Sequence, residues 1–137
     1  MKLSLKVEYA CQVLAQLGYR AGSKELPHIE DLAKAESVPS NYLVQILNEL
    51  RTAGLINSRR GKQGGYALAR RPEEITVGDI MRAVEGNVLA HSRGGDGESS
   101  RRAAVVWTEI AKKFEDLLDE VTVEDLMTSP DKAMWYI

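Results

Sequence analysis

The 137-residue sequence predicts a mainly α-helical fold that contains one small β-hairpin. Apolar residues recur at helical spacing over most of the chain, and two short β-like runs flank a glycine-rich loop between residues 55 and 68. The hydrophobic fraction of 44% is ordinary for a globular protein. Since the sequence has neither a run of about 18 apolar residues nor an export signal, we expect no membrane span and a cytoplasmic location.

Two helices are predicted before residue 37. The first carries an apolar stripe that starts at Leu3 and is expected to run to about Tyr19, where Gly22 ends it. The second follows Pro27, and acidic residues in its first turn suit the positive end of the helix dipole. Both helices are amphipathic, so each is expected to cover one side of a common core.

A third helix is predicted from about Pro39, since proline is favoured in a first helical turn, to Gly54, a helix-ending glycine. Its apolar side chains share one face, and polar side chains occupy the others. The apolar face consists of Leu43, Ile46, Leu47 and Leu50, and the polar side chains are Ser40, Asn41, Gln45 and Asn48. One face is thus expected in the core and the other in solvent.

The predicted hairpin pairs residues 55–58 with residues 66–68 around the basic, glycine-rich loop 59–65. The loop is longer than a two-residue turn, so its tip is expected to be mobile. A phosphate-binding glycine loop is the competing interpretation, but the spacing of a P-loop is missing and no helix follows directly.

The C-terminal part is predicted to hold helices after Thr76 and Thr122, each followed by an aspartate in a capping-box position. Between them a long amphipathic helix is expected from about Ser99 to Glu120. The sequence therefore divides into an N-terminal domain of residues 1–86, a flexible loop of residues 87–98, and a long helix with an apolar tail, residues 99–137.

Charge is distributed unevenly along the chain. Residues 1–72 carry 11 Lys/Arg and 6 Asp/Glu, whereas residues 73–137 carry 7 and 14. A basic front half with three helices and a basic hairpin is the order of a winged helix-turn-helix, in which the third helix enters the DNA major groove. The residues expected to contact DNA are Ser40, Asn41, Tyr42, Gln45, Arg59, Arg60, Lys62 and Gly64.

The long C-terminal helix carries a continuous apolar stripe that needs a covering surface. A second subunit is the expected cover, and folding back on its own domain is the alternative. The predicted dimer interface consists of Val106, Trp107, Ile110, Phe114, Leu117 and Leu118. Residues 1–86 are thus interpreted as the DNA-binding domain and residues 99–137 as the dimerisation helix with its tail. The apolar tail Met134–Ile137 is expected to pack on the dimer.

Three segments of the chain carry a family resemblance: Leu50-Arg51-Thr52-Ala53-Gly54-Leu55-Ile56, the wing motif Arg60-Gly61-Lys62-Gln63-Gly64-Gly65-Tyr66-Ala67-Leu68, and Thr122-Val123-Glu124-Asp125-Leu126. With these segments the sequence resembles the Rrf-two (Rrf2) family of winged-helix regulators, which includes the IscR, NsrR and CymR types. It implies a homodimer on a partly palindromic operator, with Ser40, Asn41 and Tyr42 opening the recognition helix and Arg60 as the wing arginine.

The chain departs from its apparent relatives at two places. Val44 stands where relatives often carry a glutamate that can accept from cytosine, so a different operator is expected. Many relatives hold an iron–sulfur cluster through three cysteines, but residues 87–106 contain none, and Ala104 occupies the position of the histidine ligand. No metal and no cofactor are therefore expected, as in the CymR type.

Several single residues allow two interpretations. Cys11 is a redox switch or, on the apolar stripe, a buried and inert thiol. Glu8 is an acidic ligand, as in some relatives, or a helix-surface charge. His91 is a ligand, a pH switch or a solvated loop residue, and His28 is a ligand or a helix-start residue.

The function expected from the sequence is that of a cluster-free transcriptional regulator, a repressor, which binds DNA as a homodimer. No nucleophile–base pair and no cofactor loop is found, so an enzyme is not expected. A module that controls a metabolic enzyme by binding to it, with weak or partner-dependent DNA binding, is the alternative.

Overall fold

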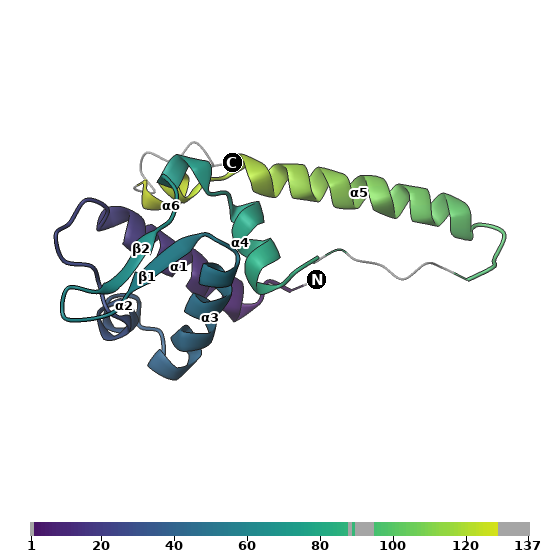
Figure 1. Ribbon diagram of the computed structural model, residues 1–137. Coiled ribbons are helices and arrows are strands. Elements are labelled where there is room, and N and C mark those ends of the chain that lie inside the picture. The colour runs from purple at the N-terminus through teal and green to yellow at the C-terminus, as the bar shows by residue number, and fades with distance from the viewer. Residues whose placement is uncertain (1, 88, 90–94, 129–137) are drawn as a thin grey trace.

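The computed structural model of the protein describes residues 2–87, 89 and 95–128 (Figure 1). Six α-helices, one 3-10 helix and two strands are assigned in these residues: α1 (Leu5–Tyr19), α2 (Ile29–Glu36), α3 (Ser40–Thr52), β1 (Ile56–Arg59), β2 (Gly65–Leu68), η1 (Pro72–Glu74), α4 (Val77–Val84), α5 (Ser100–Glu120) and α6 (Val123–Met127). In Figure 1, α1 to α4, α6 and the hairpin form one body, from which α5 projects as a long arm. The predicted fold class, mainly helical with one hairpin, is confirmed.

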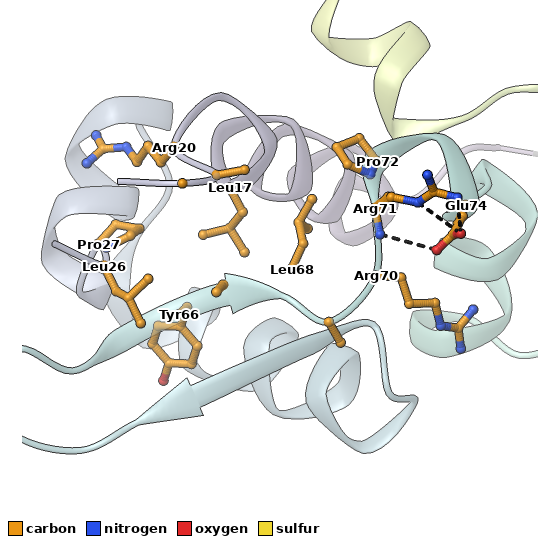
Figure 2. A pocket seen from close by; sticks show the side chains of 14 residues that line it. Leu17, Arg20, Leu26, Pro27, Tyr66, Leu68, Arg70, Arg71, Pro72 and Glu74 are labelled. Carbon is orange, nitrogen blue, oxygen red and sulfur yellow. Dashed lines mark hydrogen bonds and ion pairs between the residues drawn. The ribbon is translucent and has the colours of Figure 1, made fainter. Parts of the chain in front are cut away.

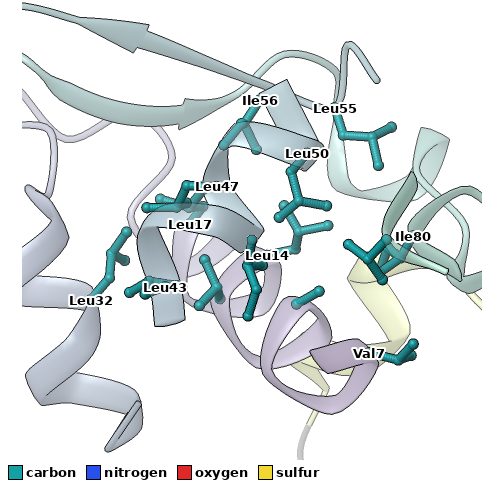
Figure 3. Packing of buried hydrophobic residues seen from close by; sticks show 14 of the residues in the cluster. Val7, Leu14, Leu17, Leu32, Leu43, Leu47, Leu50, Leu55, Ile56 and Ile80 are labelled. Atoms are coloured by element: carbon teal, nitrogen blue, oxygen red, sulfur yellow. The ribbon is translucent and has the colours of Figure 1, made fainter. Parts of the chain in front are cut away.

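The core lies where α1, α3 and α4 meet under the hairpin (Figure 3). Leu14, Leu43, Leu50 and Ile80, from three helices, have no exposed surface. Burying a side chain of this size stabilises the fold by about 1.5–3 kcal/mol. The predicted inner face of the third helix is confirmed, since all four of its apolar residues are buried.

The boundaries of α1 correct two predictions. Ser4 caps the helix, because its Oγ accepts from the backbone N–H of Val7 at 3.3 Å, so Leu3 lies before the helix and its side chain is 53% exposed. The helix ends at Tyr19 as predicted, but Gly22 does not end it. Arg20 is the C-cap residue, and its backbone N–H donates to the carbonyl of Gln16.

The start of α3 corrects a third prediction. Pro39 is the N-cap residue and does not lie inside the first turn. Its carbonyl accepts from the backbone N–H groups of Tyr42 and Leu43 at 3.1 and 3.0 Å. At the other end Gly54 has a left-handed φ of +79° just after the C-cap Ala53, as predicted for a helix-ending glycine.

The two predicted capping boxes are confirmed and lie side by side. Thr76 and Asp79 start α4, and Thr122 and Asp125 start α6, each aspartate accepting from the backbone N–H of its threonine. Thr76 and Thr122 form an antiparallel bridge. After α5 the chain therefore returns to the segment that precedes α4.

Helix α6 packs on α1, an arrangement for which the sequence contained no signal. Val123 is fully buried in the core, and the hydroxyl of Tyr19 donates to the carbonyl of Met127 at 2.7 Å. A Cβ on Gly18 would lie 2.3 Å from the sulfur of Met127, so glycine leaves room for this side chain. The division at residues 86 and 98 remains a prediction, but α6 contributes to the core of the residues before it. The tail Met134–Ile137 lies outside the described residues.

Candidate nucleic-acid interface

Helix α3 presents a mostly polar face to solvent. The buried residues of this helix share one side, and the exposed side chains before its last turn are those of Ser40, Asn41, Val44, Gln45 and Asn48. Four of these five are polar, and Val44, at 48% exposed, is the exception. All three of the predicted contact residues Ser40, Asn41 and Gln45 are therefore accessible to a ligand.

Tyr42 differs from the other predicted contact residues, because its ring is half-buried. It meets the ring of Tyr9 of α1 edge to face, with ring centroids 5.7 Å apart and an interplanar angle of 77°. This geometry is the favoured one for an aromatic pair. Tyr42 thus anchors the start of α3 on α1, and its contact with DNA remains a prediction.

Two polar contacts fix the orientation of α3. The ammonium of Lys6 in α1 lies 2.7 Å from Oε1 of Glu49. At the end of α3, Arg51 donates to Oγ of Ser58 in β1 at 3.3 Å and to Oδ1 of Asn48 at 3.1 Å. The pair with Lys6 holds α3 against α1, and the hydrogen bond to Ser58 holds it against the hairpin, whereas the bond to Asn48 lies within α3.

The hairpin has the register Ile56↔Leu68 to Arg59↔Gly65, and its tip is exposed. The side chains of Arg59, Arg60 and Lys62 are exposed there, as the predicted DNA contacts require. In the part of the chain that the structure describes, none of these three cations forms an ion pair. Their charges are thus available to an anionic partner.

Gly64 and Gly65 lie at the loop end of the hairpin, beside Arg59, but they are buried and not at its surface. A Cβ on Gly64 would lie 2.1 Å from the carbonyl oxygen of Arg59. Gly65 has a φ of +141°, and a Cβ there would lie 2.5 Å from the carbonyl oxygen of Pro27. The DNA contact of Gly64 remains a prediction. Its position requires glycine in any case, because any larger side chain would collide with the backbone of Arg59.

Helix α5 has no fully buried residue. Five of its large apolar side chains are 43–59% exposed: Val105, Val106, Trp107, Ile110 and Leu117. Phe114 and Leu118, also predicted at the dimer interface, are half-buried and line a groove of about 630 Å³ with Leu3, Leu5 and Met81. The predicted interface residues therefore form an accessible apolar surface that continues into this groove.

Cys11 lines the same groove from α1. Burial, and to a lesser extent the negative charge of Glu8, raise the pKa of the Cys11 thiol to about 11. A thiol with this pKa is almost wholly protonated at neutral pH and a poor nucleophile. The structure thus favours the inert interpretation of Cys11 over a redox switch.

The remaining candidates are placed as follows. Glu8 is an exposed residue of α1. His28 is the N-cap residue of α2, and its backbone N–H donates to Oδ2 of Asp31 at 2.8 Å, so it is a helix-start residue. His91 lies outside the described residues.

No described helix is long and apolar enough to cross a membrane.

Three features of this interface were not predicted as contacts from the sequence. The sequence indicates Val44 only as a difference from relatives that carry a glutamate there. It predicts no contact for the Lys6–Glu49 pair and none for Arg51. Arg51 lies seven residues before Ser58, so only the return of the hairpin beside α3 brings the two together. A basic residue in the last turn of a helix was the one available signal, and it usually indicates only a favourable helix dipole.

Comparison with known proteins gives consistent results. The sequence model of a family described as "Rrf2: Iron-dependent Transcriptional regulator" matches residues 3–129. The HTH-type transcriptional regulator CymR of Bacillus subtilis is 34% identical over 131 residues, which cover 96% of this chain and 93% of that protein. The solved structure of B. subtilis CymR, described as the global cysteine regulator, matches with a TM-score of 0.77 at 33% identity, over 93% of this chain and 96% of that one. The structure of T. potens IscR matches with a TM-score of 0.76 at 33% identity, over 100% and 93%.

The family description names iron, but the donor set of this chain does not fit an iron–sulfur cluster. Thiolates hold such clusters, and Cys11, the single cysteine, lies on α1 with its pKa raised. Ala104, where relatives carry a histidine ligand, has no donor atom in its side chain. Within residues 2–87, 89 and 95–128, no three His, Cys, Asp or Glu side chains gather in a way that could hold a metal ion.

Proposed function

The chain belongs to the Rrf2 family of transcriptional regulators, and we propose that, as a DNA-binding regulator and not an enzyme, it binds a partly palindromic operator as a homodimer. It represses transcription there without an iron–sulfur cluster. The observation that carries this proposal is the exposed polar face of α3 beside a hairpin tip with three exposed cations, Arg59, Arg60 and Lys62. The hydrogen bond from Arg51 to Ser58 joins the two elements.

The N-terminal end of α3 is suited to the DNA backbone. Its first turn contains no acidic residue, and the backbone N–H groups at a helix start have no partner within the helix. A phosphate is therefore attracted to this end. From the same turn Asn41, and one turn later Gln45, can reach base edges, where an amide side chain pairs with adenine in two hydrogen bonds.

The wing supplies the second contact. Arginine side chains are attracted into a narrow minor groove because the negative potential is strongest there. Arg60 is the wing arginine by the family resemblance, and Arg59 and Lys62 are placed to neutralise phosphates beside it. The buried Gly64 and Gly65 at the loop end of the hairpin support this role, since Gly64 packs on Arg59 and Gly65 packs the wing on Leu26 and Pro27.

The exposed apolar surface of α5 supports a homodimer. Side chains as large as Trp107 and Ile110 are rarely left exposed in a contiguous group on a monomer. A second copy of α5, related by a two-fold axis, covers this surface with the same residues. Two-fold symmetry in the protein then matches two half-sites in the DNA, and a dimer bound over a promoter blocks its use.

Selection of bound duplexes from a random DNA pool tests the proposal on the full chain. We expect an inverted repeat to be recovered, with an affinity that falls steeply as salt rises from about 50 to 200 mM. Recovered sequences without two-fold symmetry would contradict the homodimer, and no enrichment at low salt would contradict DNA binding. A reporter behind the selected site should be less active when the protein is present, and higher activity would contradict repression.

A second candidate uses the same helix. The exposed surface of α5 is covered by a metabolic enzyme instead of a second copy, and DNA binding is weak or depends on that partner. The exposed carboxylates of Glu109 and Glu120 on α5, which form no ion pair among the described residues, favour a partner with basic groups. Copurification of one enzyme with a monomeric chain that shifts no DNA at low salt would favour this candidate.

A further inference from the structure

A cavity of about 500 Å³ lies behind the hairpin, between the end of α1 with its following loop and the segment from β2 to η1 (Figure 2). Its apolar lining includes three leucines: Leu17 from α1, Leu26 from the loop, and Leu68 from β2. In Figure 2 the side chains of Leu17 and Leu68 face each other across it. This volume lies in the range of small-molecule sites, which are mostly apolar with a few polar groups.

The charges around this cavity are mainly positive. Arg20, Arg70 and Arg71 line it against a single carboxylate, that of Glu74. Glu74 is paired with Arg71 at 2.7 Å, which leaves the charges of Arg20 and Arg70 without a carboxylate in ion-pair contact among the described residues. Their guanidinium groups lie at opposite ends of the cavity and point outward in Figure 2. Turning Arg70 inward breaks no hydrogen bond or ion pair of its side chain among the described residues, and turning Arg20 inward breaks only the hydrogen bond from its Nε to Oε1 of Gln16 at 3.0 Å.

One wall of the cavity also supports the wing. The carbonyl of Pro27, a lining residue, accepts from the backbone N–H of Tyr66 at 2.9 Å. Gly65, the first residue of β2, is packed so closely on Leu26 and Pro27 that a Cβ there would lie within 2.8 Å of both residues. A displacement of the loop that carries Leu26 is therefore transmitted to the loop end of the hairpin, next to Arg59.

We propose that this cavity binds a small organic carboxylate with an apolar chain. The chain lies on the three leucines, and the guanidinium of Arg20 or Arg70 turns inward to pair with the carboxylate. Charge complementarity decides the class of ligand: apolar burial alone would accept an alcohol or an amine equally, but the cations around the cavity favour an anion. The alternative use of these arginines is contact with DNA phosphates.

The consequence for DNA rests on the proposed function. A ligand between Leu26 and Leu68 has a higher affinity for one conformation of the loop that carries Leu26 than for others. By linkage, binding of the ligand then changes the affinity of the wing for DNA. Binding of the ligand itself needs no DNA, so the two claims are measured separately.

The first experiment titrates octanoate into the full chain without DNA and follows the methyl resonances of the leucines by NMR. We expect saturable shifts at Leu17, Leu26 and Leu68, with a Kd on the order of 1 mM. Octanol and octylamine, of equal chain length, should bind at least about tenfold more weakly, since neither pairs with a guanidinium. Shifts confined to Leu117 of α5, no saturation, or equal binding of octanol would overturn the proposal.

Variants separate the charge from the apolar lining. The double variant R20Q/R70Q should bind octanoate about tenfold more weakly, whereas R101Q, an exposed arginine of α5, should bind as the wild type does. Wild-type octanoate affinity in the double variant, together with weaker DNA binding, would overturn the proposal in favour of phosphate contacts.

The second experiment measures DNA affinity with and without saturating octanoate. An unchanged affinity would overturn the coupling to the wing while leaving the binding site intact. A chain that binds octanoate but no DNA would contradict the proposed function and not the site.

Discussion

Arg82 of α4 donates through Nη2 to Oδ1 of Asp119 of α5 at 2.7 Å, and through Nη1 to the carboxylate of Glu115 one turn earlier. The same guanidinium also contacts Asp79 at 3.2 Å. The hydrogen bond with Asp119 is the main cause that raises the pKa of Arg82 further above its ordinary value. One side chain thus fixes the C-terminal half of the α5 arm to the domain that carries the proposed DNA interface.

Replacing Arg82 by alanine should loosen α5 from α4. Since the pairs are partly exposed, we expect a loss of only about 1 kcal/mol in the free energy of unfolding, measured with denaturant. Lys112→Ala is the control, because Lys112 pairs with Asp116 within α5 and joins no two elements. Equal losses in the two variants would mean that Arg82 has no special role in holding the arm.

Replacing Arg60 by alanine should weaken operator binding by about 1–3 kcal/mol, because a specific wing contact is removed. If the side chain contacts only a phosphate, the variant loses the same binding free energy with every DNA sequence. The slope of log affinity against log salt concentration then falls in magnitude by about one. Fluorescence anisotropy with the selected duplex measures both quantities. Arg101→Ala, an exposed arginine on α5, should bind as the wild type does, and an unchanged affinity in Arg60→Ala would refute the wing assignment.

Val44 should favour a thymine in the operator. It is the one large apolar side chain exposed on the solvent face of α3, and the thymine methyl is the apolar group of the major groove. Replacing that thymine by deoxyuridine should cost about 0.8 kcal/mol, the value of one buried methyl group. In Val44→Ala the same base change should cost nothing.

The control for Val44 is Val105→Ala, which removes a valine of similar exposure from α5. It should leave the cost of deoxyuridine as in the wild type. If no thymine position responds to the base change in the wild type, Val44 does not read a methyl group.

Introducing a charge into the exposed surface of α5 should dissociate the dimer. Ile110→Glu places a carboxylate among apolar side chains that a second copy would bury, and an unpaired buried charge is costly. Sedimentation of the wild type should give a dimer, and that of the variant a monomer with reduced operator affinity. Thr108→Glu, nearly opposite on the helix, should remain dimeric. A monomeric wild type would refute the proposed interface.

Cys11 should react slowly with iodoacetamide at pH 7. With a pKa of about 11 its thiolate fraction is roughly 100-fold below that of an ordinary thiol, and the rate should rise about tenfold per pH unit until the pKa is reached. Glu8→Gln removes a charge that raises the pKa, so it should shift this profile to lower pH. Reaction at the rate of free glutathione at pH 7 would restore the redox-switch interpretation.

Much of the fold could be predicted from the sequence because its signals are local. The capping boxes at Thr76 and Thr122, the helix end at Gly54 and the glycine-rich hairpin each depend on residues a few positions apart. The errors were also local. The predicted start of the first helix lies too early in the chain, because Leu3 continues the apolar periodicity. The hydrogen bond from the backbone N–H of Val7 to Oγ of Ser4 decides where α1 begins.

Part of the candidate site could be predicted from the sequence equally well. The polar positions of α3 and the cations of the hairpin follow from residue type and spacing, and both are exposed as expected. The half-buried state of Tyr42, the burial of Gly64 and the raised pKa of Cys11 did not follow, because each depends on a neighbour that only the folded chain supplies.

The sequence by itself thus determined which segments become helices, which face of each is apolar, and that the wing is basic, since these properties repeat over three or four residues. Only the tertiary structure decided that α6 returns to α1, that Arg82 fixes the α5 arm, and that Pro27 supports the wing beside a cavity. Tyr19 and Met127 lie 108 positions apart. No local pattern encodes such a contact, because its energy is gained only after the chain between them has been ordered.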